Sequence, residues 1–187
     1  MEHYTELQQF DEEWQALAFG AALVARMGAN YQLFSEVAEM GDTPLFGNML
    51  NLVWEFVGGK NQRIDFQKQL DKLELITPDP KLHDIYGVWP ALDATVAMAT
   101  LLGACERFDL AEIGAIADLS TATIQGYIEA VGDDVEGHPL LLAEQDCIVH
   151  LLQLIAEKPG QGRGETVASL KVFLSSLELS NIGLARE

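Results

Sequence analysis

Two carboxylates set into apolar stretches are the residues of this sequence best placed to do chemistry. Glu55 lies within residues 50–57 and Asp93 within residues 88–96, and both segments are otherwise almost entirely apolar. A carboxylate on a mostly buried helix must find hydrogen-bond partners or shift its pKa. One interpretation is that both acids brace helix ends in a structural polar network. The other is a pocket with a polar floor, edged by the aromatic residues Trp54, Tyr86 and Trp89.

The groups that could bind a metal show weaker patterns. His83 and Asp84 directly follow a proline-rich segment, and Asp146 and His150 have the four-residue spacing of an ordinary helix-surface pair. The acidic segment 133–136 lacks the alternating ligands and the terminal Glu of an EF-hand. The sequence therefore predicts no metal site and no cofactor.

The recurrent catalytic motifs are missing from the sequence. It contains no Gly-Lys-Ser/Thr phosphate loop, no G-x-G-x-x-G, no G-x-S-x-G and no Glu-x-x-His. Cys105 and Cys147 are too far apart for a zinc-binding pair, and each lies in an apolar stretch, which predicts buried, reduced thiols. These observations favour a protein that is not an enzyme, and leave the question open.

Helical periodicity runs through nearly the whole chain. Apolar residues recur at intervals of three and four, and no pair of alternating segments flanks a hairpin turn. Gly28 is predicted to end the first helix, and Asp109, with Glu112 three residues later, is predicted to cap the start of the helix 109–131. The sequence predicts an all-α fold: a single-domain globular bundle of about eight helices spanning residues 1–187. The expected helices are residues 10–27, 30–40, 45–57, 65–75, 87–106, 109–131, 140–157 and 165–177.

The net charge is strongly negative and unevenly distributed. With 11 Lys and Arg against 29 Asp and Glu, the formal charge is −18, whereas 49% apolar residues exclude a disordered acidic tail. Ten acids and no Lys or Arg fall within residues 108–157. Because phosphates and anionic membranes attract basic surfaces, we expect no direct binding to nucleic acid or membrane. An acidic surface of this kind would instead steer a basic protein partner.

Two segments of the sequence indicate where in the cell the protein is found. The first residues are acidic, unlike the basic start of a secretory signal. The apolar window 87–105 is interrupted by Pro90 and Asp93, which favours a buried helix over a membrane span. We expect a cytoplasmic protein.

One segment carries a family resemblance. The run Asp84-Ile85-Tyr86-Gly87-Val88-Trp89-Pro90-Ala91-Leu92-Asp93-Ala94 resembles the signature of the YjaG-like proteins, a bacterial family of unknown function. Trp89 stands where relatives are expected to have Tyr, and residues 108–140 match least. Further similar stretches are Asn30-Tyr31-Gln32-Leu33-Phe34, Gly41-Asp42, Leu52-Val53-Trp54-Glu55, Phe66 to Glu74, and Ser180-Asn181-Ile182-Gly183. The resemblance implies an all-α, single-domain cytoplasmic protein and no established activity. It adds Pro90 and Asn181 to the residues of interest.

Two functions remain open. The first is a non-enzymatic interaction module whose acidic surface binds a basic protein partner, or which forms a homodimer. The alternative is a small-molecule-binding or enzymatic helical protein, in which Glu55 and Asp93 converge on one cavity. The residues expected around that pocket are Trp54, Glu55, Tyr86, Trp89, Asp93 and Asn181.

Overall fold

The fold is built around one long helix, α2 (Glu13–Ala38), in the computed structural model of the protein. The structure describes residues 4–60, 63–156 and 162–185. These residues form seven long helices and one helix of a single turn, α1, and the all-α bundle predicted from the sequence is confirmed. Besides α2 these are α1 (Tyr4–Leu7), α3 (Thr43–Val57), α4 (Phe66–Ile76), α5 (Val88–Glu106), α6 (Leu110–Val131), α7 (Pro139–Ala156) and α8 (Arg163–Ser176).

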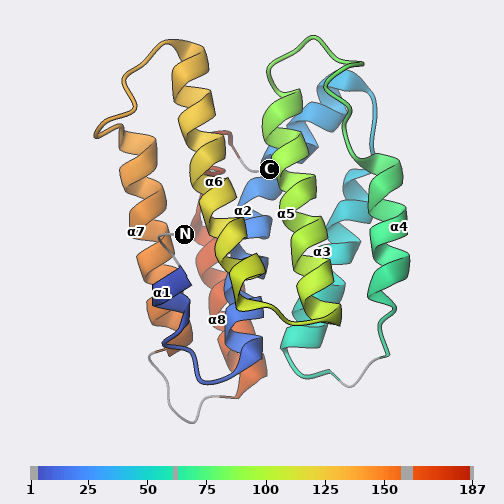
Figure 1. Ribbon diagram of the computed structural model, residues 1–187, viewed down its shortest axis with the longest axis vertical. Helices are drawn as coiled ribbons and strands as arrows, with labels where there is room; N and C mark the ends of the chain where they lie inside the picture. Colours follow the sequence, from blue (N-terminus) through green and yellow to red (C-terminus); the bar gives the residue numbers. More distant parts are fainter. Residues whose placement is uncertain (1–3, 61–62, 157–161, 186–187) are drawn as a thin grey trace.

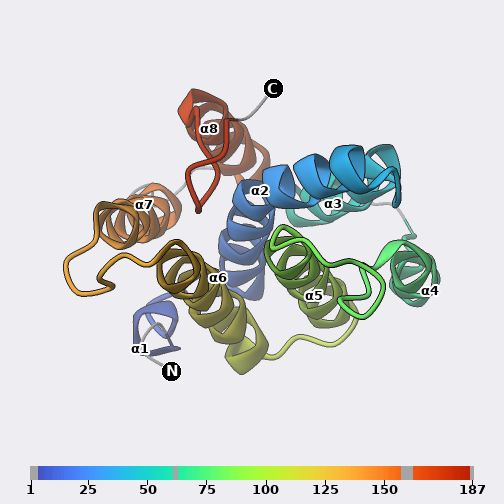
Figure 2. The ribbon, with the colours of Figure 1, turned by 90° about the horizontal axis from the view of Figure 1, so that it is seen from above.

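The other helices surround α2. Viewed from above, α3, α5, α6 and α8 lie around it, with α4 beyond α5 at one edge and α7 beyond α6 at the other (Figure 2). Helices α3 and α5 both run downward in Figure 1, so the C-terminal end of α3 and the N-terminal end of α5 lie at opposite ends of the bundle. This separation decides below which predicted site residues can meet.

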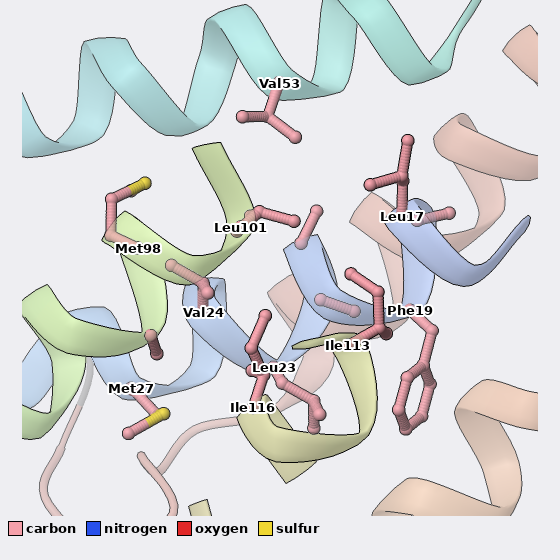
Figure 3. Close-up of a cluster of buried hydrophobic side chains, with 14 of the residues drawn as sticks. Leu17, Phe19, Leu23, Val24, Met27, Val53, Met98, Leu101, Ile113 and Ile116 are labelled. Carbon is pink, nitrogen blue, oxygen red and sulfur yellow. The ribbon is translucent and has the colours of Figure 1, made fainter. Parts of the chain in front are cut away.

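The core is a continuous apolar cluster centred on α2. Leu17, Leu23, Val24 and Met27 are buried there, against Val53 of α3, Met98 and Leu101 of α5, and Ile113 and Ile116 of α6 (Figure 3). A helix on the surface of a domain would be apolar on one stripe, whereas α2 is buried on several sides. Its central position follows from that composition.

The predicted helix end at Gly28 is wrong, because α2 continues without a break to Ala38. The two expected helices 10–27 and 30–40 are therefore one. A glycine inside a helix costs roughly 0.5–1 kcal/mol relative to alanine, which burial of the surrounding apolar residues outweighs. A Cβ atom at Gly28 would lie 3.5 Å from the ring of Phe46, an ordinary van der Waals distance, so α3 packs against α2 at this point.

Helix starts follow the expected chemistry. The Asp42, Asp65 and Asp109 carboxylates each accept a hydrogen bond from a backbone N–H in the first turn of α3, α4 and α6, at 2.8–2.9 Å. Such caps satisfy N–H groups that have no partner within the helix. The predicted cap at Asp109 is confirmed.

Among the described residues, two helices could cross a membrane by length and composition alone. They are α5 and α7, with mean hydropathy 1.4 and 1.3 over an 18-residue window. Most of the α5 window, 61%, is buried inside the bundle, as expected for a core helix. For α7 the buried share is 33%.

The segment after α8 turns back into the bundle. Leu179 and Ala185 form an isolated antiparallel bridge, and the Ser180 N–H donates to the Leu184 carbonyl at 2.7 Å. This turn buries Ser180, Asn181 and Ile182. It thereby brings a polar side chain, Asn181, between α2 and α6.

Candidate functional site

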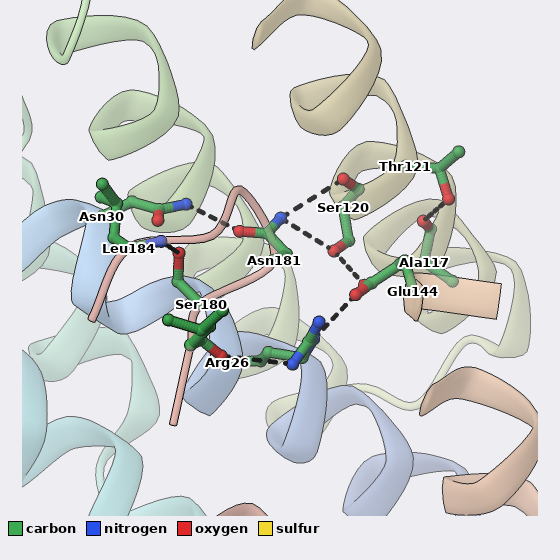
Figure 4. A network of polar contacts seen from close by, with 10 residues as sticks. Arg26, Asn30, Ala117, Ser120, Thr121, Glu144, Ser180, Asn181 and Leu184 are labelled. Atoms are coloured by element: carbon green, nitrogen blue, oxygen red, sulfur yellow. Dashed lines mark hydrogen bonds and ion pairs between the residues drawn. The ribbon is translucent and has the colours of Figure 1, made fainter. Parts of the chain in front are cut away.

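A buried polar network links α2, α6, α7 and the turn that follows α8 (Figure 4). Arg26 Nε donates to Glu144 Oε2 at 2.7 Å, and both side chains are buried. Ser120 Oγ donates to the other carboxylate oxygen, Oε1, at 2.6 Å. The charge of Glu144 is thus matched by one cation and one hydroxyl, as a buried carboxylate requires.

Two asparagines extend this network away from Glu144. Asn181 Nδ2 lies 3.3 Å from the Ser120 carbonyl oxygen and 3.1 Å from Ser120 Oγ. Asn30 Nδ2 lies 2.9 Å from Asn181 Oδ1. The second amide oxygen, Asn30 Oδ1, is buried and has no hydrogen-bond partner among the described residues.

An apolar cavity of about 270 Å³ lies beside Asn30, between α2, the start of α5, α6 and the turn after α8. Apart from Asn30 and two tyrosines its wall is apolar side chains and glycine. The lining residues are Asn30, Leu33, Phe34, Val37, Ile85, Tyr86, Gly87, Pro90, Tyr127, Ile182 and Leu184.

Tyr86 and Tyr127 form the aromatic part of this wall. Their ring centroids are 6.1 Å apart, with the planes tilted by 53°. The pKa of Tyr86 is raised above its usual value by partial burial, then by the negative charge of Asp93, by Tyr127 and by Glu129. The surroundings of Tyr86 are therefore negative, and its phenol stays protonated at neutral pH.

Asp93 lies close to Tyr86 but is held by α6. Its Oδ2 accepts a hydrogen bond from Thr123 Oγ1 at 2.8 Å, and burial raises the pKa of the carboxyl group while this hydrogen bond lowers it. This hydrogen bond fits the interpretation that Asp93 braces a helix end. It connects α5 to α6 beside the cavity.

Glu55 lies elsewhere, so the structure does not place it with Asp93 in a shared pocket. Glu55 is in the last turn of α3, where its carboxylate pairs with Lys60 at 2.9 Å near the surface. Asp93 is in the second turn of α5, toward the opposite end of the bundle. The two acids therefore do not share the expected cavity floor, because α3 and α5 run in the same direction. Glu55 instead contacts Lys60, and Asp93 contacts Thr123.

The other predicted residues divide between two regions. Trp54 is buried in the core, with Lys171 Nζ 5.7 Å from its ring centroid, and Trp89 is exposed at 54%. Tyr86 and Pro90 line the cavity, and Asn181 contacts its polar residue, Asn30. The structure brings together Tyr86, Pro90, Asp93 and Asn181 from the sequence prediction, and leaves Trp54 and Glu55 apart.

Sequence reasoning missed four members of the network: Arg26, Asn30, Ser120 and Glu144. Arg26 is a lone charge among apolar neighbours in α2, the same signal that drew attention to Glu55 and Asp93, whereas Glu144 has a second acid, Asp146, two positions further along α7. Their pairing depends on an approach of α2 and α7 across 118 positions, which periodicity cannot predict.

The ten acids of residues 108–157 differ in how exposed they are. Among them, Glu144 is buried and paired with Arg26, and Glu157 lies outside the described residues. Asp118 is half-buried on α6. The other seven are exposed on α6, α7 and the loops next to them: Asp109, Glu112, Glu129, Asp133, Asp134, Glu136 and Asp146. We call these seven residues the acidic face.

Within residues 4–60, 63–156 and 162–185, no three His, Cys, Asp or Glu side chains are grouped to hold a metal ion. Cys105 and Cys147 are buried, as predicted, and form no disulfide among the described residues.

Comparison with known proteins gives the same family that the sequence resembles. Residues 2–185 match the family model described as "Protein of unknown function (DUF416)". An uncharacterised protein of Haemophilus influenzae is 36% identical, covering 92% of each chain, and YjaG of Escherichia coli is 28% identical over 92% of this chain and 91% of its own. A crystal structure of a DUF416 family protein from Shewanella baltica matches with a TM-score of 0.90 and 34% identity, covering 98% of each chain. The predicted resemblance to YjaG-like proteins is confirmed, and the chain belongs to the DUF416 family.

Proposed function

We propose that this protein is a non-enzymatic binding protein for a small, mainly apolar molecule. The ligand would occupy the cavity beside Asn30, Tyr86 and Pro90. The proposed site differs from the pocket expected around Glu55 and Asp93. It lies near the start of α5, and neither of these two acids is among its lining residues. The proposal rests on one observation, the convergence of exposed apolar side chains on that cavity.

Four of the large apolar side chains that remain exposed line the cavity. They are Leu33 at 43%, Val37 at 64%, Ile85 at 41% and Tyr86 at 40%. A single exposed apolar residue is ordinary, whereas a group around a concave site is typical of ligand or partner binding. A ligand in the cavity would cover part of this surface.

The wall of the cavity favours reversible binding over catalysis. Its titratable side chains, among the described lining residues, are those of Tyr86 and Tyr127. General acid–base catalysis near neutral pH works best with a group that titrates there. The raised pKa of Tyr86 moves this group further from that range.

Binding of para-cresol tests the proposal. NMR titration of the labelled protein should shift resonances of Tyr86, Tyr127 and Leu33 in a saturable manner. Leu33→Trp should block the cavity and weaken binding by at least roughly tenfold. The matched control is Leu75→Trp on α4, because Leu75 is 83% exposed and lies outside the cavity wall. Absence of saturable shifts, or equal binding by the two variants, would refute the proposal.

A second candidate function is recognition of a basic protein through the acidic face. It is favoured by the seven exposed acids in a part of the chain, residues 108–157, that contains no Lys or Arg. Binding of a lysine-rich peptide should weaken with salt, and should weaken further when Glu129, Asp133 and Asp146 are neutralised. The control neutralises Glu36, Asp71 and Glu74, which lie on α2 and α4. Equal effects of the two triple variants would indicate attraction by net charge alone.

Homodimer formation is the other proposed use of these surfaces. Sedimentation at several concentrations distinguishes it, since a dimer that covers the exposed apolar side chains of the cavity wall should be lost in Leu33→Asp.

We infer a cytoplasmic location. It is supported by Cys105 and Cys147, which are buried and form no disulfide among the described residues, as is usual for proteins of reducing compartments.

A further inference from the structure

We propose that the ligand is uncharged and carries a hydrogen-bond donor, a hydroxyl or N–H group, that binds Asn30 Oδ1. This inference rests on the proposed function, since it names the chemical class of molecule that the same cavity accepts. It follows from the direction of the hydrogen bonds in the buried network and from the charges around the cavity.

The Ser120 carbonyl determines which way the two amides point. A carbonyl oxygen only accepts hydrogen bonds, so the atom of Asn181 facing it must be the donor, Nδ2. The other end of the Asn181 amide, Oδ1, then faces Asn30 and needs a donor. Asn30 must present Nδ2 to Asn181, which leaves Asn30 Oδ1 as the acceptor.

That acceptor is buried and unpaired. Asn30 is 2% exposed, and its Oδ1 has no partner among the residues that the structure describes. Asn30 is also part of the cavity wall, whose other members are mostly apolar. A ligand that packs against Asn30 without donating to Oδ1 leaves this buried acceptor unpaired, so a ligand that donates a hydrogen bond to it is favoured.

The hydrogen bonds of the network all run in one direction, which strengthens the preference for a ligand that donates to Asn30 Oδ1. Asn30 donates to Asn181, Asn181 to Ser120 and Ser120 to the Glu144 carboxylate. Each donor therefore points toward the negative charge of Glu144. Aligned hydrogen bonds polarise one another, so a ligand that donates to Asn30 Oδ1 continues the chain.

Charged ligands are disfavoured for separate reasons. Neither Lys nor Arg is among the described lining residues, and Asp93 and Glu129 make the surroundings of Tyr86 negative. A carboxylate would therefore meet an acceptor and no cation. An ammonium group would lose its hydration in return for one amide oxygen, which does not compensate for burying a charge.

A series of para-substituted toluenes separates these properties without changing the protein. Para-cresol donates a hydrogen bond, para-methylanisole only accepts, and para-toluate is anionic. We expect para-cresol to bind roughly tenfold more tightly than para-methylanisole, the effect of about one buried hydrogen bond, and para-toluate to cause no saturable NMR shifts.

The outcomes distinguish this inference from the proposed function. If para-methylanisole binds as tightly as para-cresol, or para-toluate binds more tightly, the donor inference is overturned and the binding function stands. If none of the three binds, both are overturned.

Asn30→Leu provides the protein-side test. It removes the acceptor and should abolish the preference for para-cresol over para-methylanisole, while apolar binding persists. A preference that survives in a folded Asn30→Leu protein overturns the inference. Circular dichroism establishes whether this variant folds, and the ligand series with the unmodified protein decides the question independently.

Discussion

Arg26 of α2 and Glu144 of α7 form a buried ion pair, with Nε and Oε2 2.7 Å apart across 118 positions of the chain. The pair joins the central helix to an outer one. Ser120 and the Leu179 carbonyl complete its hydrogen bonds, the latter through Arg26 Nη1 at 3.4 Å.

Replacing Arg26 by methionine should lower the free energy of unfolding by about 3–5 kcal/mol, because it leaves Glu144 buried without its cation. Urea denaturation measures this loss. The control is Lys60→Met, which breaks an ion pair that is largely exposed and should cost less than about 1 kcal/mol. Similar losses in the two variants would mean that burial does not distinguish the pairs. Combining Arg26→Met with Glu144→Leu should recover part of the stability, since neither charge then remains buried alone.

Replacing Asp93 by asparagine should change how stability depends on pH. Burial raises the pKa of Asp93 in the folded protein above the ordinary value of 3.8, so the folded state holds this proton more tightly than the unfolded state. Ionisation of Asp93 therefore costs stability as the pH rises from 3.8 through the folded pKa. Asp93→Asn keeps an acceptor for Thr123 and removes this cost, so its stability relative to wild type should increase from acidic to neutral pH.

Urea denaturation at several pH values checks the Asp93 prediction. Asp84→Asn, which removes one charge at an exposed position, is the control. A relative stability of Asp93→Asn that falls with rising pH would contradict the expected sign.

Gly41→Ala should destabilise the protein by about 1–3 kcal/mol. Gly41 has a φ of +88°, and a Cβ atom there would lie 2.5 Å from the Tyr31 hydroxyl oxygen. That hydroxyl accepts from the Asp42 N–H and donates to the Ile76 carbonyl, so a shift would disturb two contacts. Gly47→Ala is the comparison, because Gly47 lies inside α3 with nothing within 4 Å of the added atom. Thermal unfolding should show Gly47→Ala to be neutral or up to about 1 kcal/mol more stable.

Cys105 should be inert toward thiol reagents in the folded protein. Burial raises the pKa of its thiol to about 12, and the thiolate is the reactive form. Mass spectrometry after alkylation at mildly alkaline pH should find Cys105 unmodified in buffer and modified in denaturant. Rapid modification under native conditions would show that the end of α5 opens readily.

The helical fold was predictable because it is encoded locally. Apolar spacing located most of the helices, and Asp109 was recognisable as a cap from its position. The break at Gly28 could not be excluded in the same way. Whether Gly28 ends a helix depends on how neighbouring residues such as Met27 are buried against other helices, which is a tertiary property.

The candidate site was predictable only in part. Tyr86 was identified as an aromatic residue near Asp93 in the sequence, and Pro90 and Asn181 were identified from the family resemblance. All three lie at or beside the cavity. Glu55 was included because its neighbours along the chain are apolar, yet its side chain reaches Lys60 near the surface. A side chain's direction depends on helix orientation, and the residues that unite the network come from segments up to 151 positions apart.

The burial of α2 on several sides has a consequence for how the chain folds. Its partners include α6, α7 and the turn after α8, so α2 cannot bury its apolar surface against local neighbours alone. Helical bundles dominated by local contacts fold fastest, and contacts between distant segments slow the search. During synthesis α2 emerges before the segments that cover it, and it then exposes apolar surface of the kind that promotes aggregation. We therefore expect this protein to fold more slowly than its helical content suggests, with chaperones acting first on α2.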